Sequence, residues 1–518
     1  MSSSHLRNDA KYFRLVALLA VLAMCLCVAA RAEDFPGGVR DTLGPQFGPA
    51  SRSTVARPPP RPGTGANERL RHWNQIAIDA SGLDHTPVAA GESRVFGEQF
   101  GPGRSSRAMA IVHIAIFDAV NAIVGGYESY TGIAPASVET SVETAIATAA
   151  HDTLVALFPS QAASFDTLLA EDLGNIRTRT ASAKRRGMAL GSQAAAAILA
   201  LRADDGSQHS ELRVGVNYIP GEEPGEWRQD PISQSPLALG ALWGEVKPFA
   251  LRSGHQFRVV RPPLLASPEY AVAFDEVKRL GGDGIVTPTQ RTAEQTEIGI
   301  FWAYDGTPSL CAPPRLYNQI AMQIADQRSP SVIELARLMA LVNVAMADAG
   351  IAIWESKYYY GFWRPVTGIR ESDPGTGPTA GGDGSPLTLG DASFTPLGAP
   401  ASNLAGPNFT PPFPSYPSGH AGFGGALFQT LRNFLGTDAV PFTFVSDEFN
   451  GVTLGNDGEV RPLRARSFAS LAAAEEENGQ SRIYLGIHWA FDKTEGIAQG
   501  RRVADYVFGH AFVPVRDK

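Results

Sequence analysis

The chain has 518 residues, of which 44% are hydrophobic and 19% charged, with a formal net charge of −8 at pH 7. Ordinary apolar content with a small charge per residue excludes an intrinsically disordered protein. The acidic balance and the lack of a Lys/Arg-rich run exclude nucleic acid as the main partner. Only three cysteines are present, which excludes a disulfide framework and a cysteine-based zinc site.

The first 32 residues have the pattern of a secretory signal peptide. Basic residues precede an uncharged run from Leu15 to Ala30, and the run ends in Ala30-Arg31-Ala32, which fits a small-x-small cleavage site. The run is shorter than the about 20 residues that a membrane span needs. We therefore expect a secreted or periplasmic protein with no stable membrane span after cleavage. An uncleaved N-terminal anchor is the alternative.

Helical patterns dominate after an extended, Pro- and Gly-rich lead-in at residues 33–64. The helical signal begins near Arg69, and further helices are predicted at 104–124, 137–157, 160–203, 268–280, 287–304, 312–328 and 331–356. Residues 205–265 predict long connections, and alternating strand patterns are scarce. We predict an all-α fold of two helical bundles, at residues 65–285 and 286–518, with the functional pocket in the C-terminal bundle.

The segment 371–416 differs from the rest of the chain because it is dense in proline and glycine. This composition predicts a long irregular loop, and loops of such length inside compact domains are usually functional or disordered. We expect the loop to fold over a pocket and to shape its entrance.

The first of three chemically suggestive segments runs from Lys357 to Pro365. Lys357 and Arg364 are seven residues apart, which is two helical turns, so both cations are expected to project from one helix face. The aromatic residues between them indicate a buried face rather than a solvated surface pair.

The second segment, Phe413 to His420, is a proline-punctuated loop that runs into a small-residue helix. The amides of Ser418, Gly419 and His420 are expected at the helix N-terminus, where free N–H groups and the helix dipole favour an oxyanion. The Ser418 hydroxyl adds a donor and His420 a titratable imidazole. Glycines further along this helix cost helix propensity, which predicts a close approach of another backbone.

The third segment, Ser481 to Asp492, contains Arg482 and His488. His488 and Asp492 are four residues apart, so on a helix the carboxylate would orient the imidazole and raise its basicity. The planar guanidinium of Arg482 suits an oxyanion.

Together the three segments supply three cations, a helix N-terminus and two imidazoles, which fits a multiply charged anion of phosphate shape. With phosphate, His488 would attack phosphorus and His420 would protonate the leaving group, giving an acid phosphatase. With vanadate, His488 would bind vanadium, and hydrogen peroxide would oxidise a halide there. A non-catalytic helical binding protein that retains the pocket is the third reading.

The segments resemble the three-part signature K-x6-R-P, P-S-G-H and S-R-x5-H-x3-D of the type-2 phosphatidic acid phosphatase and vanadium-dependent haloperoxidase superfamily. The resemblance implies a vanadate cofactor, with hydrogen peroxide, a halide and an organic acceptor as partners. By resemblance, vanadate would be bound by Lys357, Arg364, Ser418, Gly419, His420, Arg482 and His488. His488 would be the metal ligand, and His420, His488 and Lys357 would be the catalytic residues.

The resemblance extends to the chloroperoxidase-like branch through residues 301–319, 354–370 and 411–420. In this branch an Asp pairs with the second Arg, so Asp305 would neutralise Arg482 and Asp492 would support His488. By the same resemblance, Trp354, Phe413 and Ser415 would line the halide pocket. Phe413 resembles the aromatic residue of chloride-oxidising members, so chloride is favoured over bromide. Ser415 departs from the small apolar residue of the fungal enzymes, which leaves free hypohalous acid and directed halogenation as alternatives.

Overall fold

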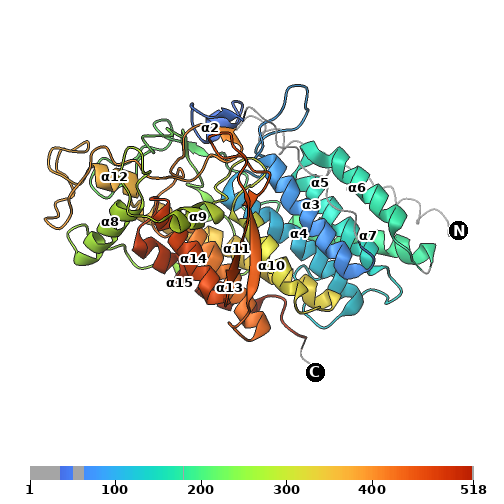
Figure 1. Cartoon of the computed structure of the whole chain (residues 1–518). Coiled ribbons are helices and arrows are strands. Elements are labelled where there is room, and N and C mark those ends of the chain that lie inside the picture. The colour runs from blue at the N-terminus through green and yellow to red at the C-terminus, as the bar shows by residue number, and fades with distance from the viewer. Residues whose placement is uncertain (1–34, 51–62, 179, 516–518) are drawn as a thin grey trace.

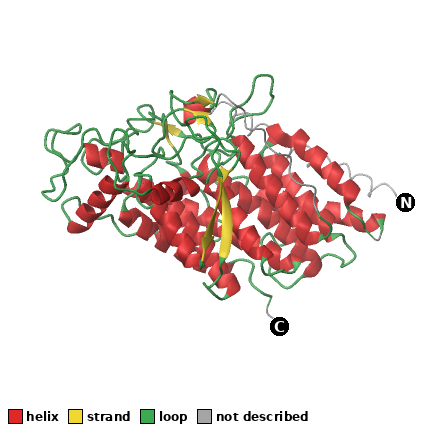
Figure 2. Cartoon of the chain, in the orientation of Figure 1, coloured by secondary structure: helices red, strands yellow, loops and turns green. Residues whose placement is uncertain are grey.

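The computed structural model describes residues 35–50, 63–178 and 180–515. The predicted signal peptide lies outside the described residues. Within them the fold is all-α, as the sequence predicts, with only short strands (Figure 2). The α-helices are α2 (Val39–Thr42), α3 (Ala66–Asp84), α4 (Gly101–Val124), α5 (Val142–Leu157), α6 (Ala162–Asn175), α7 (Ala181–Leu201), α8 (Pro268–Leu280), α9 (Ala293–Phe301), α10 (Pro313–Asp326), α11 (Val332–Tyr360), α12 (Pro365–Arg370), α13 (Gly419–Leu435), α14 (Leu471–Tyr484) and α15 (Ala490–His510).

The remaining elements are short. They are the 3-10 helices η1 (Pro159–Gln161), η2 (Trp243–Glu245) and η3 (Gly254–Phe257), and the strands β1 (Gly48–Pro49), β2 (Leu212–Arg213), β3 (Leu237–Ala238), β4 (Leu404–Ala405), β5 (Phe442–Asn450) and β6 (Leu463–Phe468). The strands form three antiparallel pairs, β1–β4, β2–β3 and β5–β6. The β5–β6 hairpin was not predicted. It pairs Phe442 with Phe468 and is interrupted by a bulge after Val445.

The two longest apolar helices, α4 and α11, pack against each other at the centre of the molecule. Helices α5 and α7 extend the packing from α4, and α13 and α15 extend it from α11 (Figure 1). This arrangement gives two bundles that meet along the α4–α11 contact. Between them they share one continuous hydrophobic core, which runs from Phe35 to Phe512.

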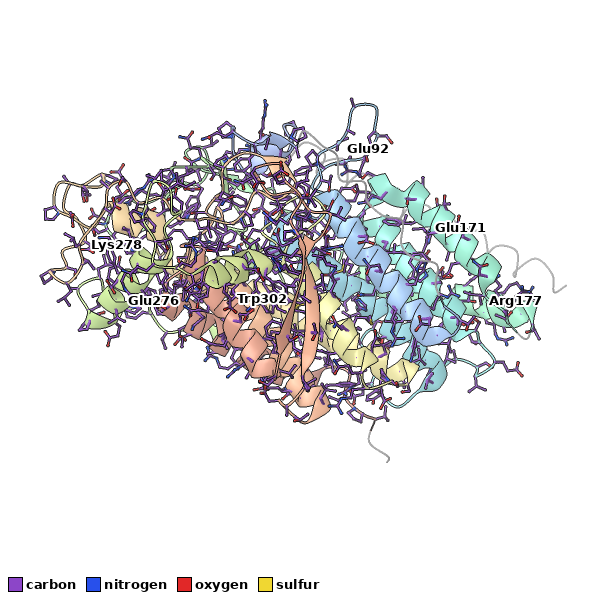
Figure 3. The ribbon with its side chains drawn as sticks, in the orientation of Figure 1. Glu92, Glu171, Arg177, Glu276, Lys278 and Trp302 are labelled. Atoms are coloured by element: carbon purple, nitrogen blue, oxygen red, sulfur yellow. The ribbon has the colours of Figure 1, made fainter. Side chains whose placement is uncertain are left out.

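Local sequence signals explain where several helices begin and end. Ser331 and Glu334 form a capping box at the start of α11, in which each side chain accepts from the other residue's amide. The same helix ends at Gly361, whose φ of 58° is left-handed and favours glycine. Side chains fill the space between the helices. Trp302, at the end of α9, is fully buried and donates from Nε1 to Glu477 (Figure 3).

Among the described helices, α4 and α11 are long and apolar enough to span a membrane by length and composition, and the expectation of no stable membrane span stays a prediction. In α4, 94% of the most apolar window is buried inside the protein, and in α11 the whole window is buried. Core helices of a soluble protein pass the same test, so the hydropathy of both helices is explained by their central position in the bundles.

The predicted loop 371–416 is irregular throughout, apart from the two residues of β4. The lead-in, in contrast, is not merely extended. Its described part folds into α2 and β1, and β1 pairs with β4 of the loop. Two segments that sequence analysis treated separately therefore lie side by side, at the upper edge of the molecule in Figure 1.

Candidate active site

The three predicted segments meet around one buried cavity, although their residues belong to, or adjoin, five helices. Lys357 lies in the last turn of α11, Arg364 is the N-cap of α12, Ser418 is the N-cap of α13 before Gly419 and His420, Arg482 lies in the last turn of α14, and His488 precedes α15. All of these side chains are buried. Each lies at or next to a helix terminus. Gly419, His420, Arg482 and His488 line the cavity, whereas Lys357 and Arg364 do not line it and instead contact its lining residues Phe413 and His488.

The predicted geometry of Lys357 and Arg364 is wrong, although the two residues do face the same site. Helix α11 stops at Tyr360, and Arg364 has an extended backbone with φ −82° and ψ 157°. The two side chains therefore do not share a helix face. A chain reversal at Gly361, rather than two helical turns, brings them together.

Arg364 has a buried donor without a hydrogen-bond partner. Its Nε donates to the Phe413 carbonyl at 2.9 Å, and its Nη1 contacts the Ile487 carbonyl and His488 Nε2, each at 2.9 Å. Its Nη2 is buried and has no hydrogen-bond partner. Burial lowers the pKa of the guanidinium to about 9. A buried donor without an acceptor destabilises the protein unless a ligand accepts a hydrogen bond from it.

Arg482 provides two further donors without partners. Its Nη2 donates to both oxygens of Asp305, at 2.6 and 2.9 Å, while its Nε and Nη1 are buried and have no partner. The predicted pairing of Asp305 with Arg482 is therefore present. Burial raises the pKa of the Asp305 carboxyl, and Arg482 opposes that shift.

Lys357 contributes a third cation in an enclosed position. Its Nζ donates to the carbonyls of Pro414 and Ser415, both at 2.8 Å, and lies 5.1 Å from the centre of the Phe413 ring. Burial, together with the charge of Arg364, lowers the pKa of the ammonium well below its usual range. The negative charge of a bound anion would stabilise the ammonium and so oppose the lowering of its pKa by burial and by Arg364.

His488 is fixed in one tautomer by Asp492. The Nδ1 atom lies 2.7 Å from Asp492 Oδ2, and a carboxylate can only accept, so Nδ1 carries the hydrogen and Nε2 keeps its lone pair. His488 and Asp492 are in contact as predicted, but they do not lie on the same helix. His488 precedes α15, and Asp492 lies in the first turn, where it also accepts from the Trp489 amide. Burial and Arg364 lower the pKa of His488, so the ring is neutral.

His420 is held in the opposite tautomer. Its Nε2 donates to the carbonyl of Ala303, and its Nδ1 faces Asp305 Oδ1 at 3.9 Å. Burial, followed by the charge of Arg482, lowers its pKa well below 6.5. The neutral ring therefore presents an unprotonated Nδ1 beside the Asp305–Arg482 pair.

The start of α13 is built as the second segment predicts. The Ser418 hydroxyl accepts from the Ala421 amide at 3.4 Å, so it caps the helix. Gly419 lines the cavity, and a Cβ there would lie 3.3 Å from the Trp354 ring. The Ser418 amide, which was also predicted to face the anion, donates instead to the Asp492 carbonyl at 3.0 Å. The amides of Gly419 and His420 come first in the helix, have no intrahelical acceptor and are therefore the ones available to an anion.

Two of the three predicted halide-pocket residues line the cavity. The rings of Trp354 and Phe413 pack edge to face, with centroids 4.9 Å apart, and both face the cavity. Ser415 does not line it. Its hydroxyl donates to Asp492 Oδ2 behind the imidazole and lies 3.4 Å from His488 Nδ1.

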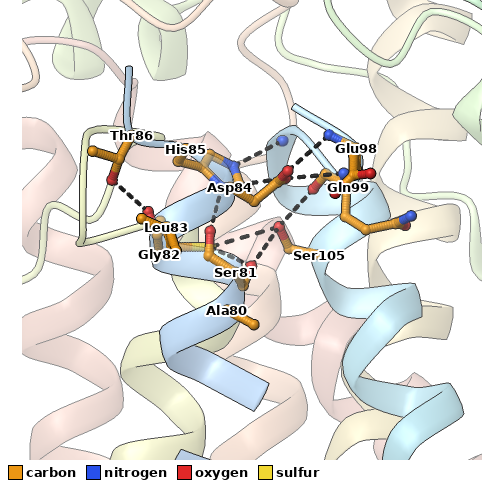
Figure 4. A network of polar contacts seen from close by, with 12 residues as sticks. Ala80, Ser81, Gly82, Leu83, Asp84, His85, Thr86, Glu98, Gln99 and Ser105 are labelled. Carbon is orange, nitrogen blue, oxygen red and sulfur yellow. Dashed lines mark hydrogen bonds and ion pairs between the residues drawn. The ribbon is translucent and has the colours of Figure 1, made fainter. Parts of the chain in front are cut away.

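Part of the cavity wall comes from segments that the sequence did not single out. Phe100, Gly101 and Pro102, at the start of α4, are lining residues. A buried polar network fixes this turn (Figure 4). In it, His85 Nε2 accepts from the Gly101 amide at 3.0 Å. The Asp84 carboxylate accepts from the amides of residues 98 and 99, just before α4. No motif marks these residues, since their role depends only on packing.

Comparison with known proteins identifies the family. The family model described as the second helical-bundle domain of VCPO matches residues 337–516. The vanadium chloroperoxidase of Curvularia inaequalis is 30% identical over 503 residues, which cover 81% of this chain and 78% of that protein. The chain belongs to the vanadium-dependent haloperoxidase family. The predicted recognition is thereby confirmed.

Solved structures show the same fold for this haloperoxidase. A bacterial vanadium-dependent iodoperoxidase aligns with a TM-score of 0.68 at 24% identity, covering 88% of this chain and 99% of the other. The holo form of a bacterial vanadium-dependent chloroperoxidase aligns with a TM-score of 0.59 at 17% identity, covering 81% and 94%. The family model begins at residue 337, whereas the predicted C-terminal bundle begins at 286, and that boundary stays a prediction.

The cofactor of this haloperoxidase family is vanadate, and the residues of the cavity fit it. Three buried guanidinium nitrogens, on Arg364 and Arg482, have no partner, and a multiply charged tetrahedral oxo-anion offers the acceptors that they lack. His488 Nε2 is unprotonated, so its lone pair, which accepts from Arg364 Nη1 at 2.9 Å in this structure, suits a metal ligand. The three cations outnumber the carboxylates of Asp305 and Asp492, so an anion also balances the buried charge.

Proposed function

We propose that this haloperoxidase binds vanadate through Lys357, Arg364, Arg482, the α13 N-terminus and His488 Nε2, and oxidises chloride or bromide with hydrogen peroxide. The three partnerless guanidinium donors around a neutral His488 carry the proposal. Arg364 Nη1 lies 2.9 Å from His488 Nε2, so this guanidinium is next to the atom that would bind vanadium.

Each side chain has a separate part in this proposal. Bound vanadate supplies an electrophilic centre at which hydrogen peroxide is activated toward halide. His488, oriented by Asp492, holds the centre through Nε2. Arg364, Arg482 and Lys357 hold the oxo groups and stabilise negative charge there. His420 Nδ1 takes a proton from the peroxide and returns it later, since Nε2 is committed to the Ala303 carbonyl.

We propose chloride as the favoured halide. Phe413 lies beside both cationic groups, 4.9 Å from the Arg364 guanidinium carbon and 5.1 Å from Lys357 Nζ, measured to the ring centre. Together with Trp354 it makes one side of the cavity apolar, which lowers the local dielectric and strengthens charge interactions with a small anion. The 30% identical relative is a vanadium chloroperoxidase, which supports the same choice.

Reconstitution of the purified full-length protein tests the function. Vanadate-free protein is titrated with orthovanadate and assayed with hydrogen peroxide, a dimedone-type acceptor and each halide in turn. We expect halogenation that requires vanadate, peroxide and a halide, with kcat/KM clearly measurable for chloride as well as for bromide. Activity with bromide but none with chloride would contradict the choice of chloride. Strong p-nitrophenyl phosphate hydrolysis with no halogenation would instead establish the acid phosphatase. The His488→Ala variant is the negative control.

A further inference from the structure

Leu239 connects the two aromatic residues of the proposed halide pocket. Its side chain lines the cavity with Trp354 and Phe413, although it belongs to the stretch 205–265, for which the sequence predicted only long connections. The Leu239 carbonyl accepts from Trp354 Nε1 at 3.0 Å. Its amide donates at 2.9 Å to the carbonyl of Pro412, the residue before Phe413. One residue thus holds a side chain of α11 and the backbone of the loop before α13.

The position of Leu239 depends on the tight turn that follows it. Gly240 has a φ of 76°, which favours glycine. A Cβ at Gly240 would lie 2.4 Å from both Cδ1 and Nε1 of Trp354, so the turn packs directly on the indole. A shift of this turn would therefore move Trp354 and, with it, one wall of the cavity.

A buried carboxylate holds the turn from outside the cavity. Glu211, the residue before β2, is 7% exposed and does not line the cavity. Its Oε2 accepts from the Gly240 amide at 2.5 Å, and its Oε1 accepts from Arg104 Nη1. Arg104 also donates from Nη2 to the His209 carbonyl at 2.5 Å. Because each carboxylate oxygen has a partner, the orientation of Glu211 is fixed.

The Glu211–Arg104 pair also connects the turn to a second wall of the cavity. Arg104 lies in the first turn of α4, whose first residue, Gly101, lines the cavity. A Cβ at Gly101 would lie 3.4 Å from the Leu239 side chain. Leu239 is therefore packed between α4 and α11, and the buried ion pair sets the position of its backbone relative to α4.

We propose that Glu211 is a positioning residue of the halide pocket, which holds Leu239 and the Trp354 indole at the spacing that favours chloride over bromide. The inference rests on the proposed function, because it concerns the same halide pocket. Loosening the turn would widen the apolar side of the cavity, and a smaller ion loses more of its contacts there than a larger one. Neither partner of Glu211, Arg104 or Gly240, belongs to the proposed vanadate site, so vanadate binding should not depend on it.

Steady-state halogenation by the vanadate-loaded, full-length protein tests the effect on halide selection. Glu211→Gln keeps the size of the side chain but has one acceptor oxygen, so it cannot bind Arg104 and the Gly240 amide as the carboxylate does. We expect KM to rise by about tenfold for chloride and by about threefold or less for bromide, which lowers the chloride-to-bromide ratio of kcat/KM. Vanadate Kd, measured by equilibrium dialysis, should stay within about twofold of the wild type.

Hydrogen–deuterium exchange in the vanadate-free protein tests the hold on the turn without an activity assay. In Glu211→Gln, the amides of Leu239 and Gly240 should exchange about tenfold faster than in the wild type, because the turn opens locally more often. A loss of stability spread over the whole protein would instead raise exchange in all its core helices.

Asp205→Asn is the matched control. Asp205 is a buried carboxylate that accepts from Arg107, one turn after Arg104 on α4, and its other partners are Arg202 and the Ser207 amide rather than the turn at Gly240. It should change neither the halide ratio nor the exchange of residues 239–240. If Glu211→Gln does not fold, Arg104→Lys, which keeps the charge but lacks the planar fork, should lower the ratio by a smaller factor.

An unchanged halide ratio in the folded variant would overturn the positioning role, and so would an equal change in Asp205→Asn. Halogenation with neither halide by the vanadate-loaded wild type would overturn the proposed function instead. The exchange measurement would then still decide whether Glu211 holds the turn.

Discussion

At the scale of single residues, the site depends on hydrogen-bond donors that the protein leaves unused. Arg364 is held at Nε and Nη1 and Arg482 at Nη2, while Arg364 Nη2 and Arg482 Nε and Nη1 have no partner. Buried donors without acceptors destabilise the vanadate-free protein, and a bound oxo-anion removes this destabilisation by accepting hydrogen bonds from them. The residue types were predictable from the sequence, but which guanidinium nitrogens lack a hydrogen-bond partner was not.

Asp305 should control vanadate affinity through Arg482. In Asp305→Asn the amide cannot neutralise the guanidinium, and Arg482 loses the carboxylate that fixes its orientation. We expect vanadate Kd, measured by equilibrium dialysis, to rise by about 10–100-fold. Asp438→Asn is the control, since its carboxylate is 40% exposed and pairs with Arg432 on the surface. An equal change in both variants would show that the Asp305 effect is not local.

At the scale of elements, glycine-mediated contact of α13 with α15 holds the site together. A Cβ at Gly425 would lie 2.6 Å from the Ile497 carbonyl oxygen, so the backbones touch where sequence analysis predicted a close approach. This contact places the Ser418–His420 turn directly against Asp492, whose carbonyl accepts from the Ser418 amide at 3.0 Å. Helix packing thus sets the distance between two site segments.

Gly500→Ala should test that packing. The new Cβ would lie 2.0 Å from the Gly422 carbonyl oxygen, which forces α13 and α15 apart. We expect a loss of about 1–3 kcal/mol in the free energy of unfolding, measured by denaturant titration. Gly509→Ala in the same helix has no atom within 4 Å of its Cβ and should be neutral or slightly stabilising. A Gly500→Ala variant as stable as Gly509→Ala would contradict the contact.

At the scale of the whole molecule, the two bundles behave as one folding unit because their core is continuous. Helices α4 and α11 belong to different bundles, yet they pack against each other and both are buried almost completely. Separating the bundles would expose two long apolar helices, which costs about 25 cal/mol for each Å² of apolar surface uncovered.

A fragment with residues 286–518 should therefore not fold alone, although it carries every predicted site residue. We expect no cooperative transition in calorimetry and no vanadate binding by dialysis, because the face of α11 that covers α4 would be exposed. The intact chain should unfold in one main transition under the same conditions. Cooperative unfolding of the fragment with full vanadate affinity would show that the bundles are independent.

The sequence by itself determined the fold class, the family and the residue types of the proposed anion site. Helical periodicity and the three motifs are local, so they can be read without knowing where the chain goes. The expected helix face of Lys357 and Arg364, and the expected lining role of Ser415, were wrong because they depended on turns at Gly361 and in the loop before α13.

Only the tertiary structure decided which segments close the cavity. Leu43 and Phe100 carry no chemical signature, and a polar network around His85 acts through backbone amides rather than through a motif. Contacts between residues hundreds of positions apart depend on how the bundles pack, which no local pattern encodes. The residue types therefore indicate the chemistry of the anion site, whereas the size of the space around it depends on how the chain packs.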